Sequence, residues 1–550
     1  MLGQMMQMPL MISSLIVHAE RHHGEQEVVS RRVEGDIHRC TYKDIARRSR
    51  QVANALAGLG VKFGDRVATL AWNTHRHMEL YFGVSGSGAV LHTVNPRLHP
   101  DQVVYIAGHA EDQVMFFDMT FWPLIQAVAS RCTTIKHWVA LTDQAHMPAA
   151  DQAAKVPGLL CYEDLIASQS DRYVWPDFDE NTASSLCYTS GTTGNPKGVL
   201  YSHRSTLLHT LAAALPDCLN IGAMDTVLPV VPMFHVNSWG IVYAAPMTGS
   251  KLVLPGPGLD GKSLYELFES EGVTLSAGVP TVWQGLLAYV GANDLKFSTM
   301  RRSAIGGSAC PPAMIKTFLN DYNVRVIHAW GMTEMSPLGT TGGFKPCHTK
   351  ETPEKRLAVM ATQGRAVFGV DLKIVDPQGV ELPWDGQQSG DVLVRGPWII
   401  DRYFKDEGGN PQVKDAAGHD WFPTGDVAKF DADGYMLITD RSKDVIKSGG
   451  EWIGSIDLEN IAMAHTAVAM AACIAAFHPK WDERPLLVVV KKPGAEVTRE
   501  DLISFYDGKI AKWWTPDDVV FVDAIPLGAT GKMQKIKLRE QFKDHKLPTA

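Results

Sequence analysis

The twelve residues YTSGTTGNPKGV, from Tyr188 to Val199, contain three glycines, three threonines, one serine and one lysine. Glycines let several backbone N–H groups point toward one anion, the hydroxyl groups add donors, and the lysine adds a positive charge. The stretch follows the strand-like sequence SSLCY, and α/β proteins bind ligands at the carboxyl ends of their strands. We therefore predict a loop that binds a triphosphate; a flexible surface loop is the alternative.

Two better-known phosphate motifs fit less well. A P-loop requires GxxxxGK followed by serine or threonine, but Gly198 follows Lys197. The sequence GPGLDG, Gly256 to Gly261, matches GxGxxG between a strand and a helix. However, Pro257 removes a backbone donor, and Asp260 places a negative charge where a pyrophosphate would sit at the helix N-terminus. We interpret GPGLDG as an ordinary strand-to-helix turn.

Composition narrows the class of protein. The 550 residues exceed one ordinary domain, and 45% apolar with 20% charged residues is typical of globular chains. The net charge of −8 disfavours a nucleic acid or an anionic membrane as the main partner. Eight scattered cysteines without a CxxC pair indicate reduced thiols, and no run of about 18 apolar residues marks a membrane span. We expect a cytoplasmic protein without an integral membrane segment.

Helical and strand patterns alternate along much of the chain, which predicts an α/β fold with layered, largely parallel sheets. The pattern predicts helices at SWGIVYAAPMTGS, residues 238–250, and at REDLISFYDGKIAKWW, residues 499–514. From about residue 364, short alternating strands with Gly/Asp turns predict a β-rich subdomain. The charged stretch DRSKDVIKSGG then opens a last segment, so we predict an N-terminal domain over 1–440 and a small α+β C-terminal domain over 441–550.

Five motifs in a fixed order carry a family resemblance. The Tyr188–Val199 stretch is followed by HAWGMTE (328–334), WFPTGD (421–426), DRSKDVIKSGGEW (440–452) and GATGKMQK (528–535). Together they resemble the adenylate-forming superfamily, which includes AMP-forming acyl-CoA synthetases, peptide-synthetase adenylation domains and beetle luciferases. The stretches MLGQMM, VPMFHVNSWG and WDERPLLVVV are most similar to bacterial ligases for medium-chain fatty acids and for 3-methylmercaptopropionate.

The resemblance implies a reaction in two halves. A carboxylic acid attacks the α-phosphate of ATP to give acyl-AMP and pyrophosphate, and the thiol of coenzyme A then displaces AMP. Because an anion approaches a polyanion, positioning and charge neutralisation carry the first half. The family uses Mg²⁺, rotates its small C-terminal domain between the two halves, and includes homodimers.

The resemblance also assigns residues to these roles. Lys197 and the loop hydroxyls hold the β- and γ-phosphates, Trp330 stacks on adenine, and Asp426 with Arg441 contacts the ribose. Lys532 bridges the acyl carboxylate and ATP in the first half, and Lys443 marks the hinge. The predicted catalytic residues are Lys532, Thr189, Lys197 and Glu334, with Thr189 and Glu334 also predicted to bind the metal. The predicted nucleotide and coenzyme A contacts are Thr189, Ser190, Gly191, Thr192, Thr193, Gly194, Lys197, Gly307, His328, Ala329, Trp330, Gly331, Met332, Thr333, Asp426, Arg441, Lys443, Lys447, Gly449, Gly450, Glu451, Trp452 and Lys532.

The acyl site is predicted from the same resemblance. His235 approaches the carboxylate and Trp239 closes the acyl tunnel, although both residues suit a packed core equally well. The full predicted set is His235, Val236, Trp239, Gly306, Gly307, Met332 and Met335. No charged residue stands out in this set, which favours an apolar acid, with 3-methylmercaptopropionate or an aryl-alkanoate as alternatives.

One stretch departs from the family pattern. In IGSIDLE, residues 453–459, Gly454 and Asp457 stand where related sequences have serine and glutamate, beside the predicted coenzyme A channel. Asp457 is expected to cap the helix that starts there. Two other functions remain as alternatives: transfer of the acyl group to another acceptor such as a carrier protein, and a nucleotide-binding protein without catalytic activity.

Overall fold

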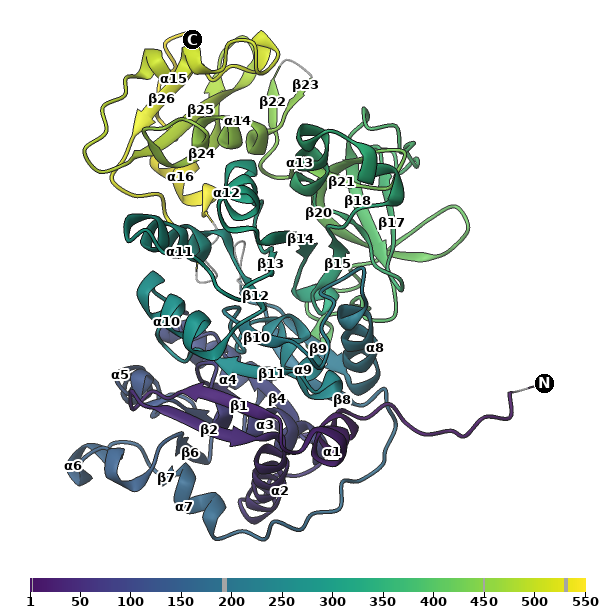
Figure 1. Ribbon diagram of the computed structural model, residues 1–550, viewed down its shortest axis with the longest axis vertical. Helices are drawn as coiled ribbons and strands as arrows, with labels where there is room; N and C mark the ends of the chain where they lie inside the picture. Colours follow the sequence, from purple (N-terminus) through teal and green to yellow (C-terminus); the bar gives the residue numbers. More distant parts are fainter. Residues whose placement is uncertain (2, 190–194, 449–450, 529–532) are drawn as a thin grey trace.

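The computed structural model describes residues 1–550 apart from 2, 190–194, 449–450 and 529–532, and apart from the side chains of Glu451 and Trp452. Two large sheets form the body of the protein, a smaller sheet follows them, and a further sheet with its helices completes the chain (Figure 1). This arrangement confirms the predicted layered α/β body, the β-rich subdomain and the small α+β C-terminal segment.

The first large sheet has seven strands, and all neighbouring pairs are parallel except β8 with β9. In spatial order the strands are β7 (Leu159–Cys161), β6 (His137–Ala140), β5 (Val114–Phe117), β3 (Arg66–Leu70), β4 (Val90–Thr93), β8 (Ala183–Tyr188) and β9 (Gly198–Ser202). Strands β8 and β9 flank the glycine-rich stretch. It therefore connects two antiparallel strands at the carboxyl end of β8, as the sequence predicts.

The second large sheet has nine strands with a parallel centre and antiparallel edges. In spatial order they are β16 (Arg365–Ala366), β15 (Leu338–Thr341), β14 (Arg325–Gly331), β13 (Arg302–Ile305), β12 (Leu275–Gly278), β10 (Thr226–Pro229), β11 (Lys251–Leu254), β1 (Glu27–Arg31) and β2 (Ile37–Thr41). The HAWGMTE motif begins on β14 and continues just beyond its carboxyl end.

Helices cover both sheets and fill the space between them. They are α1 (Ile12–His23), α2 (Tyr42–Gly58), α3 (His75–Gly86), α4 (Pro100–Ala110), α5 (Trp122–Val128), α6 (Ala150–Ala153), α7 (Tyr162–Ala167), α8 (His203–Ala214), α9 (Ile241–Thr248), α10 (Gly261–Glu271), α11 (Pro280–Ala292), α12 (Pro312–Tyr322) and α13 (Pro353–Ala361). Every residue of α3 is buried. Gly83 lets α3 approach α2, because a Cβ there would lie 2.9 Å from the Ser49 carbonyl oxygen.

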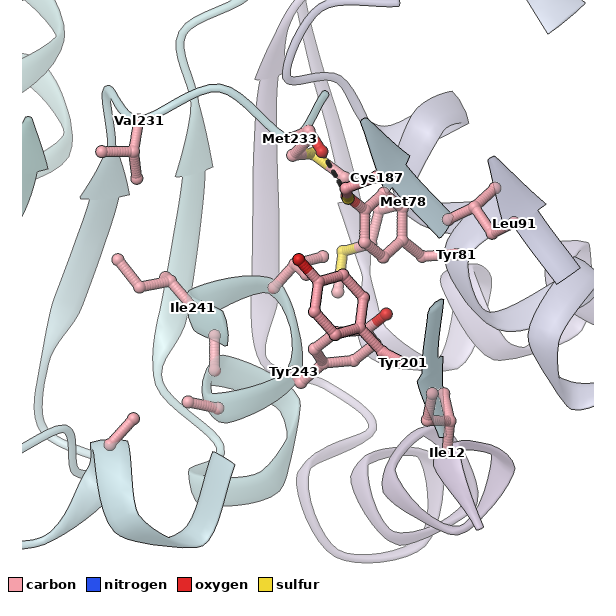
Figure 2. Close-up of a cluster of buried hydrophobic side chains, with 14 of the residues drawn as sticks. Ile12, Met78, Tyr81, Leu91, Cys187, Tyr201, Val231, Met233, Ile241 and Tyr243 are labelled. Atoms are coloured by element: carbon pink, nitrogen blue, oxygen red, sulfur yellow. Dashed lines mark hydrogen bonds between the residues drawn. The ribbon is translucent and has the colours of Figure 1, made fainter. Parts of the chain in front are cut away.

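The main hydrophobic core joins segments that are far apart in the sequence. Figure 2 shows Ile12 of α1, Tyr81 of α3, Cys187 of β8 and Tyr243 of α9 converging in one cluster. This core fixes the two large sheets relative to each other, and it therefore fixes their strand ends, where the predicted site residues lie.

Two smaller sheets follow the body. The β-rich sheet contains β17 (Asp371–Val375), β18 (Gly390–Arg395), β19 (Val413–Lys414), β20 (Asp420–Phe430) and β21 (Met436–Arg441). The C-terminal sheet contains β22 (Ile446–Ser448), β23 (Glu451–Ile453), β24 (Val468–His478), β25 (Asp482–Lys491) and β26 (Asp518–Phe521), accompanied by α14 (Ser455–Met463), α15 (Arg499–Phe505) and α16 (Lys535–Gln541).

Two predicted helices are shorter than their sequence patterns suggest. The helix expected over 238–250 begins at Ile241, because residues 236–239 have left-handed backbone with φ between 45° and 53°. The helix expected over 499–514 ends at Phe505, shortly before Gly508, whose φ is 72°. In both places the local backbone conformation stops a helix that the hydrophobic pattern alone would continue.

Two local predictions have opposite outcomes. Asp260 accepts a hydrogen bond from the Ser263 backbone at 3.0 Å, so GPGLDG is an ordinary capped start of α10. The prediction that Asp457 caps α14 is wrong. Gly454 occupies the N-cap position without a side-chain cap, and the Ser455 N–H donates to Asp440 Oδ2 at 2.7 Å. The Asp440 carboxylate on β21 therefore accepts the hydrogen bond that sequence analysis assigned to Asp457.

Among the residues that the structure describes, no helix has both the length and the apolar character needed to cross a lipid bilayer.

Candidate active site

A cavity of about 1290 Å³ lies where β8, β13 and β14 end, and it is bounded by β20, β21 and the C-terminal segment. Most of the predicted residues that the structure describes border this cavity. They are Thr189, Lys197, His235, Val236, Trp239, Gly306, Gly307, His328, Ala329, Trp330, Gly331, Met332, Thr333, Glu334, Asp426, Arg441 and Lys443. Residues separated by more than 250 positions in the sequence thus share one space.

Some predicted residues lie elsewhere. Met335 is fully buried in the main core against Gly339 and is not among the residues that line the cavity, so its contact with the substrate stays a prediction. Lys447 is exposed on β22, where its N–H donates to Glu483 at 2.7 Å. The following predictions lie outside the described residues or side chains: Ser190, Gly191, Thr192, Thr193, Gly194, Gly449, Gly450, Glu451, Trp452 and Lys532.

Two hydrogen bonds join Thr189 and Lys197, which lie near the two ends of the glycine-rich stretch. The Thr189 N–H donates to the Lys197 carbonyl at 2.9 Å, and the Lys197 N–H donates to Thr189 Oγ1 at 3.2 Å. The Lys197 Nζ lies 4.8 Å from the ring centroid of Tyr403. The Lys197 Nζ also packs against Gly408, because a Cβ added at Gly408 would lie 2.5 Å from this nitrogen. Backbone pairing and an aromatic face therefore fix the position of this cation.

Glu334 lies in a short 3₁₀ turn, Thr333–Met335, directly after β14. The Tyr403 hydroxyl donates to Glu334 Oε1 at 2.8 Å, and the Ile400 N–H donates to the Glu334 carbonyl at 2.8 Å. Burial and the Glu334 carboxylate raise the pKa of Tyr403, which keeps its hydroxyl a donor. The Tyr403 side chain thus contacts both Lys197 and Glu334. No motif marked Tyr403, which lies in a segment that sequence patterns left unassigned.

Trp330, Asp426 and Arg441 form one polar group on the cavity wall. The Trp330 Nε1–H donates to Asp426 Oδ2 at 2.8 Å, and Arg441 Nε lies 3.3 Å from Asp426 Oδ1. These three residues come from β14, β20 and β21, so the predicted adenosine contacts meet as the motifs implied. The indole and the guanidinium hold the Asp426 carboxylate from two sides and fix its orientation.

His328 is a buried neutral side chain in the same wall. The Cys310 N–H donates to its Nε2 at 3.2 Å, and its Nδ1–H donates to the Ala361 carbonyl at 3.1 Å. Burial lowers the pKa of His328 to about 4. The imidazole therefore connects β14 to its neighbours as an uncharged group.

A strained turn forms the other side of the cavity. Val236, Asn237, Ser238 and Trp239 all have left-handed backbone, which is unfavourable for L-residues. The Asn237 amide holds the turn: its Nδ2 donates to Ser185 Oγ at 3.0 Å, and the Tyr81 hydroxyl donates to its Oδ1 at 3.3 Å. The turn brings Trp239 against Gly306 of the β13 end, where an added Cβ would lie 3.3 Å from the indole.

Apolar residues that sequence analysis identified only in part also line the cavity, and we call the seven given below the apolar arm. Ala213 at the end of α8 and Leu219 after it join the predicted residues here. The arm consists of Ala213, Leu219, Val236, Trp239, Met332, Pro337 and Leu338. Ala213 and Leu219 carry no motif, and only their place in the fold identifies them.

Comparisons with known proteins agree with this geometry. Residues 16–404 match the model of the family described as AMP-binding enzyme, and residues 457–532 match that of the AMP-binding enzyme C-terminal domain. The chain is 54% identical to a 3-methylmercaptopropionyl-CoA ligase of Ruegeria lacuscaerulensis, over 99% of both chains. It is 51% identical to a medium-chain-fatty-acid–CoA ligase of Ectopseudomonas oleovorans, over 99% of this chain and 98% of that one.

A solved structure shows the same fold. An anthranilate CoA ligase in complex with anthranoyl-AMP superposes with a TM-score of 0.84 at 24% identity, covering 96% of each chain. The family match spans most of the sequence, and two relatives share more than half of its residues over nearly its whole length. The chain belongs to the AMP-binding enzyme family.

Proposed function

We propose that this protein is an ATP-dependent, AMP-forming carboxylic acid–CoA ligase that acts on medium-chain fatty acids through an acyl-adenylate. The observation that carries the proposal is one cavity that is lined both by Lys197, Glu334 and Asp426 and by the apolar arm. Relatives named for this reaction at 51% and 54% identity support it. The relative at 54% identity is named for 3-methylmercaptopropionate, so this compound is the alternative acid.

The residues divide into groups that bind and groups that orient. Lys197 and the hydroxyls of Thr189, Ser190, Thr192 and Thr193 hold the β- and γ-phosphates. Thr333 contacts the α-phosphate, and the Trp330–Asp426–Arg441 group binds adenosine. Held in this way, the α-phosphate stays in place while the acid approaches it.

A magnesium ion fits the donor set. Glu334 offers a carboxylate and Thr189 a hydroxyl, both beside the same cavity, and Mg²⁺ prefers such oxygen ligands. When bound, Mg²⁺ neutralises phosphate charge. The Tyr403 hydroxyl donates to the Glu334 carboxylate and orients it, as hydrogen bonds to ligating carboxylates do in metal sites.

The acid occupies the apolar arm in this proposal. His235 borders the cavity beside Val236 and Trp239, so a carboxylate near His235 leaves its hydrocarbon chain among the apolar side chains. The seven residues of the arm carry no ionisable group, so an apolar tail is favoured over a charged or hydroxylated one.

We divide the chain into a body, residues 1–440, and a rotating C-terminal domain, residues 441–550, with Lys443 at the hinge. Lys532 enters for adenylate formation and withdraws when the loop at Lys447–Trp452 lines the coenzyme A channel. We further propose that the enzyme works in the cytoplasm, which suits its free cysteines, and as a homodimer, a state that sedimentation measures directly.

The decisive experiment separates the two half-reactions. We expect Lys532→Ala to slow adenylate formation, measured as pyrophosphate release, by at least about 100-fold because a cation leaves the attacked phosphate. Thioester formation from synthetic acyl-AMP should stay within about twofold, and Lys543→Ala serves as an exposed control. Equal losses in both half-reactions contradict the division of labour, and AMP release from synthetic acyl-AMP that requires a non-thiol acceptor and not coenzyme A contradicts coenzyme A as the acceptor.

A matched pair of variants on α8 tests the acyl site. Ala213→Phe fills the arm, so kcat/KM for C8 to C12 acids should fall about 10- to 100-fold relative to butyrate, since each lost methylene contact weakens discrimination. Leu211→Phe lies on the same helix with an exposed side chain and should leave the profile unchanged. An unchanged profile in Ala213→Phe places the acyl chain elsewhere. A panel of C3 to C16 acids, methylmercaptopropionate and aryl-propionates then ranks the candidate acids.

A further inference from the structure

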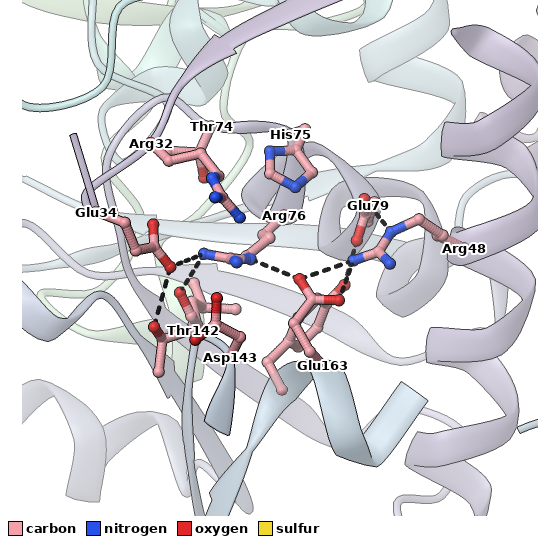
Figure 3. A network of polar contacts seen from close by, with 12 residues as sticks. Arg32, Glu34, Arg48, Thr74, His75, Arg76, Glu79, Thr142, Asp143 and Glu163 are labelled. Carbon is pink, nitrogen blue, oxygen red and sulfur yellow. Dashed lines mark hydrogen bonds and ion pairs between the residues drawn. The ribbon is translucent and has the colours of Figure 1, made fainter. Parts of the chain in front are cut away.

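A second polar cluster lies outside the reaction cavity. The turn between β1 and β2 meets the segment that follows β6, and this contact brings together Glu34, Thr142, Asp143 and His146. Figure 3 shows Glu34 beside Thr142 and Asp143, with Arg76 of α3 next to them. None of these residues borders the cavity described above. The cluster connects the edge of the nine-stranded sheet to the seven-stranded sheet.

Only one oxygen of the Glu34 carboxylate accepts hydrogen bonds from the described residues. Its Oε1 accepts hydrogen bonds from Arg76 Nη1 at 2.7 Å and from the Thr142 hydroxyl at 2.9 Å. Its Oε2 is buried and has no hydrogen-bond partner in the described part of the chain. The Glu34 side chain is 6% exposed. Because a buried carboxylate oxygen without a partner is costly, this atom indicates a ligand.

The surrounding network contains more negative than positive groups. Its two guanidinium groups are Arg48 and Arg76, and its carboxylates are Glu34, Glu79, Asp143 and Glu163. Nearby Arg32 is paired with Asp36 at 2.7 Å and adds no excess positive charge. The network is therefore short of a cation.

The neighbouring histidines do not supply that cation. His38 and His75 stack with their ring centroids 4.1 Å apart. Burial lowers the pKa of both, well below its ordinary value for His75, so these imidazoles are neutral at pH 7. The excess negative charge thus remains beside Glu34.

The geometry of the donors suits a metal ion. One carboxylate oxygen each from Glu34 and Asp143 and one ring nitrogen of His146 lie within 4.8 Å of one another. Asp143 Oδ1 and His146 Nδ1 are 2.6 Å apart, a hydrogen bond that a bound metal ion replaces by taking the place of the shared proton. Arg76 and Thr142 hold Glu34 from behind, as outer hydrogen bonds hold ligating carboxylates.

We propose that Glu34, Asp143 and His146 bind a divalent cation of the zinc or manganese type and thereby fasten the β1–β2 turn to the segment after β6. Two carboxylates and an imidazole are a ligand set that such metals accept, with further positions left to water. The site stabilises the junction of the two sheets and takes no part in the reaction in the cavity.

Equilibrium dialysis of the full-length, nucleotide-free protein against Zn²⁺ tests the proposal, with bound metal measured by mass spectrometry. All variants carry Cys347→Ser, because Cys347, His348 and Asp433 form a second group of possible ligands. We expect His146→Ala and Asp143→Asn each to lose one equivalent of zinc. Both side chains are partly exposed, so these variants keep the fold: His146 is 51% exposed and Asp143 34%. Asp151→Asn, an exposed acid close by, should keep the full stoichiometry.

Thermal unfolding gives a second readout that does not depend on catalysis. Zinc at about 100 times its dissociation constant should raise the Tm of the parent by a few degrees, and by less in His146→Ala, because a ligand stabilises only the state that binds it. The same stoichiometry and the same shift in parent and His146→Ala overturn the proposal. Absence of bound zinc in the parent also overturns it and leaves an ordered water as the partner of Glu34 Oε2.

Discussion

Two contacts between the C-terminal segment and the rest of the described chain differ in chemistry. Beside β21, Asp440 accepts a hydrogen bond from the Ser455 N–H at 2.7 Å, and its buried carboxylate interacts electrostatically with Lys535, which pairs with Glu459 inside the segment. Across the cavity, on the far side, the Gln284 amide donates to the Ala469 carbonyl at 3.1 Å in an exposed position. The first contact consists of desolvated charges, and the second consists of a neutral hydrogen bond open to water.

The difference indicates how the segment is held. Breaking a buried ion pair is strongly unfavourable, whereas an exposed amide exchanges its partner for water at little cost. The segment is therefore fixed close to residues 440–444 and weakly held across the cavity. This asymmetry is the arrangement that the proposed rotation about Lys443 requires.

The largest expected effect comes from removing the buried cation at the firm contact. Lys535→Ala leaves Glu459 buried without its partner, and we expect a loss of about 3–5 kcal/mol in the unfolding free energy of the C-terminal segment. Urea denaturation combined with hydrogen exchange over residues 446–550 measures it. Lys543→Ala, an exposed lysine in the same segment, should change stability by less than about 0.5 kcal/mol. Equal effects of the two variants contradict the comparison.

Acid should distinguish the body from the C-terminal segment. Burial lowers the pKa of His77, His203 and His328 to about 4 and that of His209 to about 3. Because unfolded histidine titrates near 6.5, the unfolded body takes up protons first, and its stability falls as pH drops from about 6.5 toward 4. The loss is about 2 kcal/mol per histidine at pH 5.

The C-terminal side should respond differently, since burial raises the pKa of Glu459 and its protonation does not favour unfolding at low pH. Denaturation at pH 7 and pH 5, with hydrogen exchange to locate the weakened region, compares the two parts. His203→Gln retains an acceptor for the Ile12 N–H. This variant should lose about 2 kcal/mol less unfolding free energy than the parent between pH 7 and pH 5, because one buried histidine is absent. Equal sensitivity of body and segment sinks the prediction.

A smaller effect is expected at the cap of α14. Asp440→Ala removes the acceptor of the Ser455 N–H, so we expect a loss of about 1–2 kcal/mol and faster hydrogen exchange in the first turn of that helix. Asp457→Ala is the matched control, because the N-cap position of this helix has no side-chain hydrogen bond. A larger loss from Asp457→Ala restores the capping role that the sequence suggested.

The smallest effect is expected at the weak contact. Gln284→Ala removes the exposed hydrogen bond to Ala469 and should change stability by less than about 0.5 kcal/mol. Urea denaturation gives this value beside that of Lys535→Ala. A loss above about 2 kcal/mol shows that the far side of the cavity holds the segment as firmly as β21 does.

Sequence analysis located most of the polar wall because its residues lie within compact motifs. Trp330 and Glu334 belong to a run of seven residues, and strand ends carry such runs to the same edge of a sheet. The same reasoning placed the glycine-rich stretch at the carboxyl end of the strand that is β8, and the structure adds β9 after it. Local patterns were sufficient to locate site residues that lie close together in the sequence.

Sequence analysis failed where segments that are distant in the sequence together form one wall of the cavity. Tyr403, Ala213 and Leu219 border the cavity although none has a local signal, because tertiary packing alone brings them there. The pattern that predicted a helix from residue 238 ignored Asn237, whose amide contacts stabilise left-handed backbone instead.

That turn has an energetic consequence of its own. Four successive L-residues in mirror-image helical conformation cost about 4–8 kcal/mol in total relative to right-handed backbone. The body of the protein compensates for this cost through its core and through the Asn237 amide. Conformational energy is thus stored in the wall of the cavity, and loss of the hydrogen bond between Asn237 and Ser185 would let the turn relax and move the Trp239 indole away from Gly306.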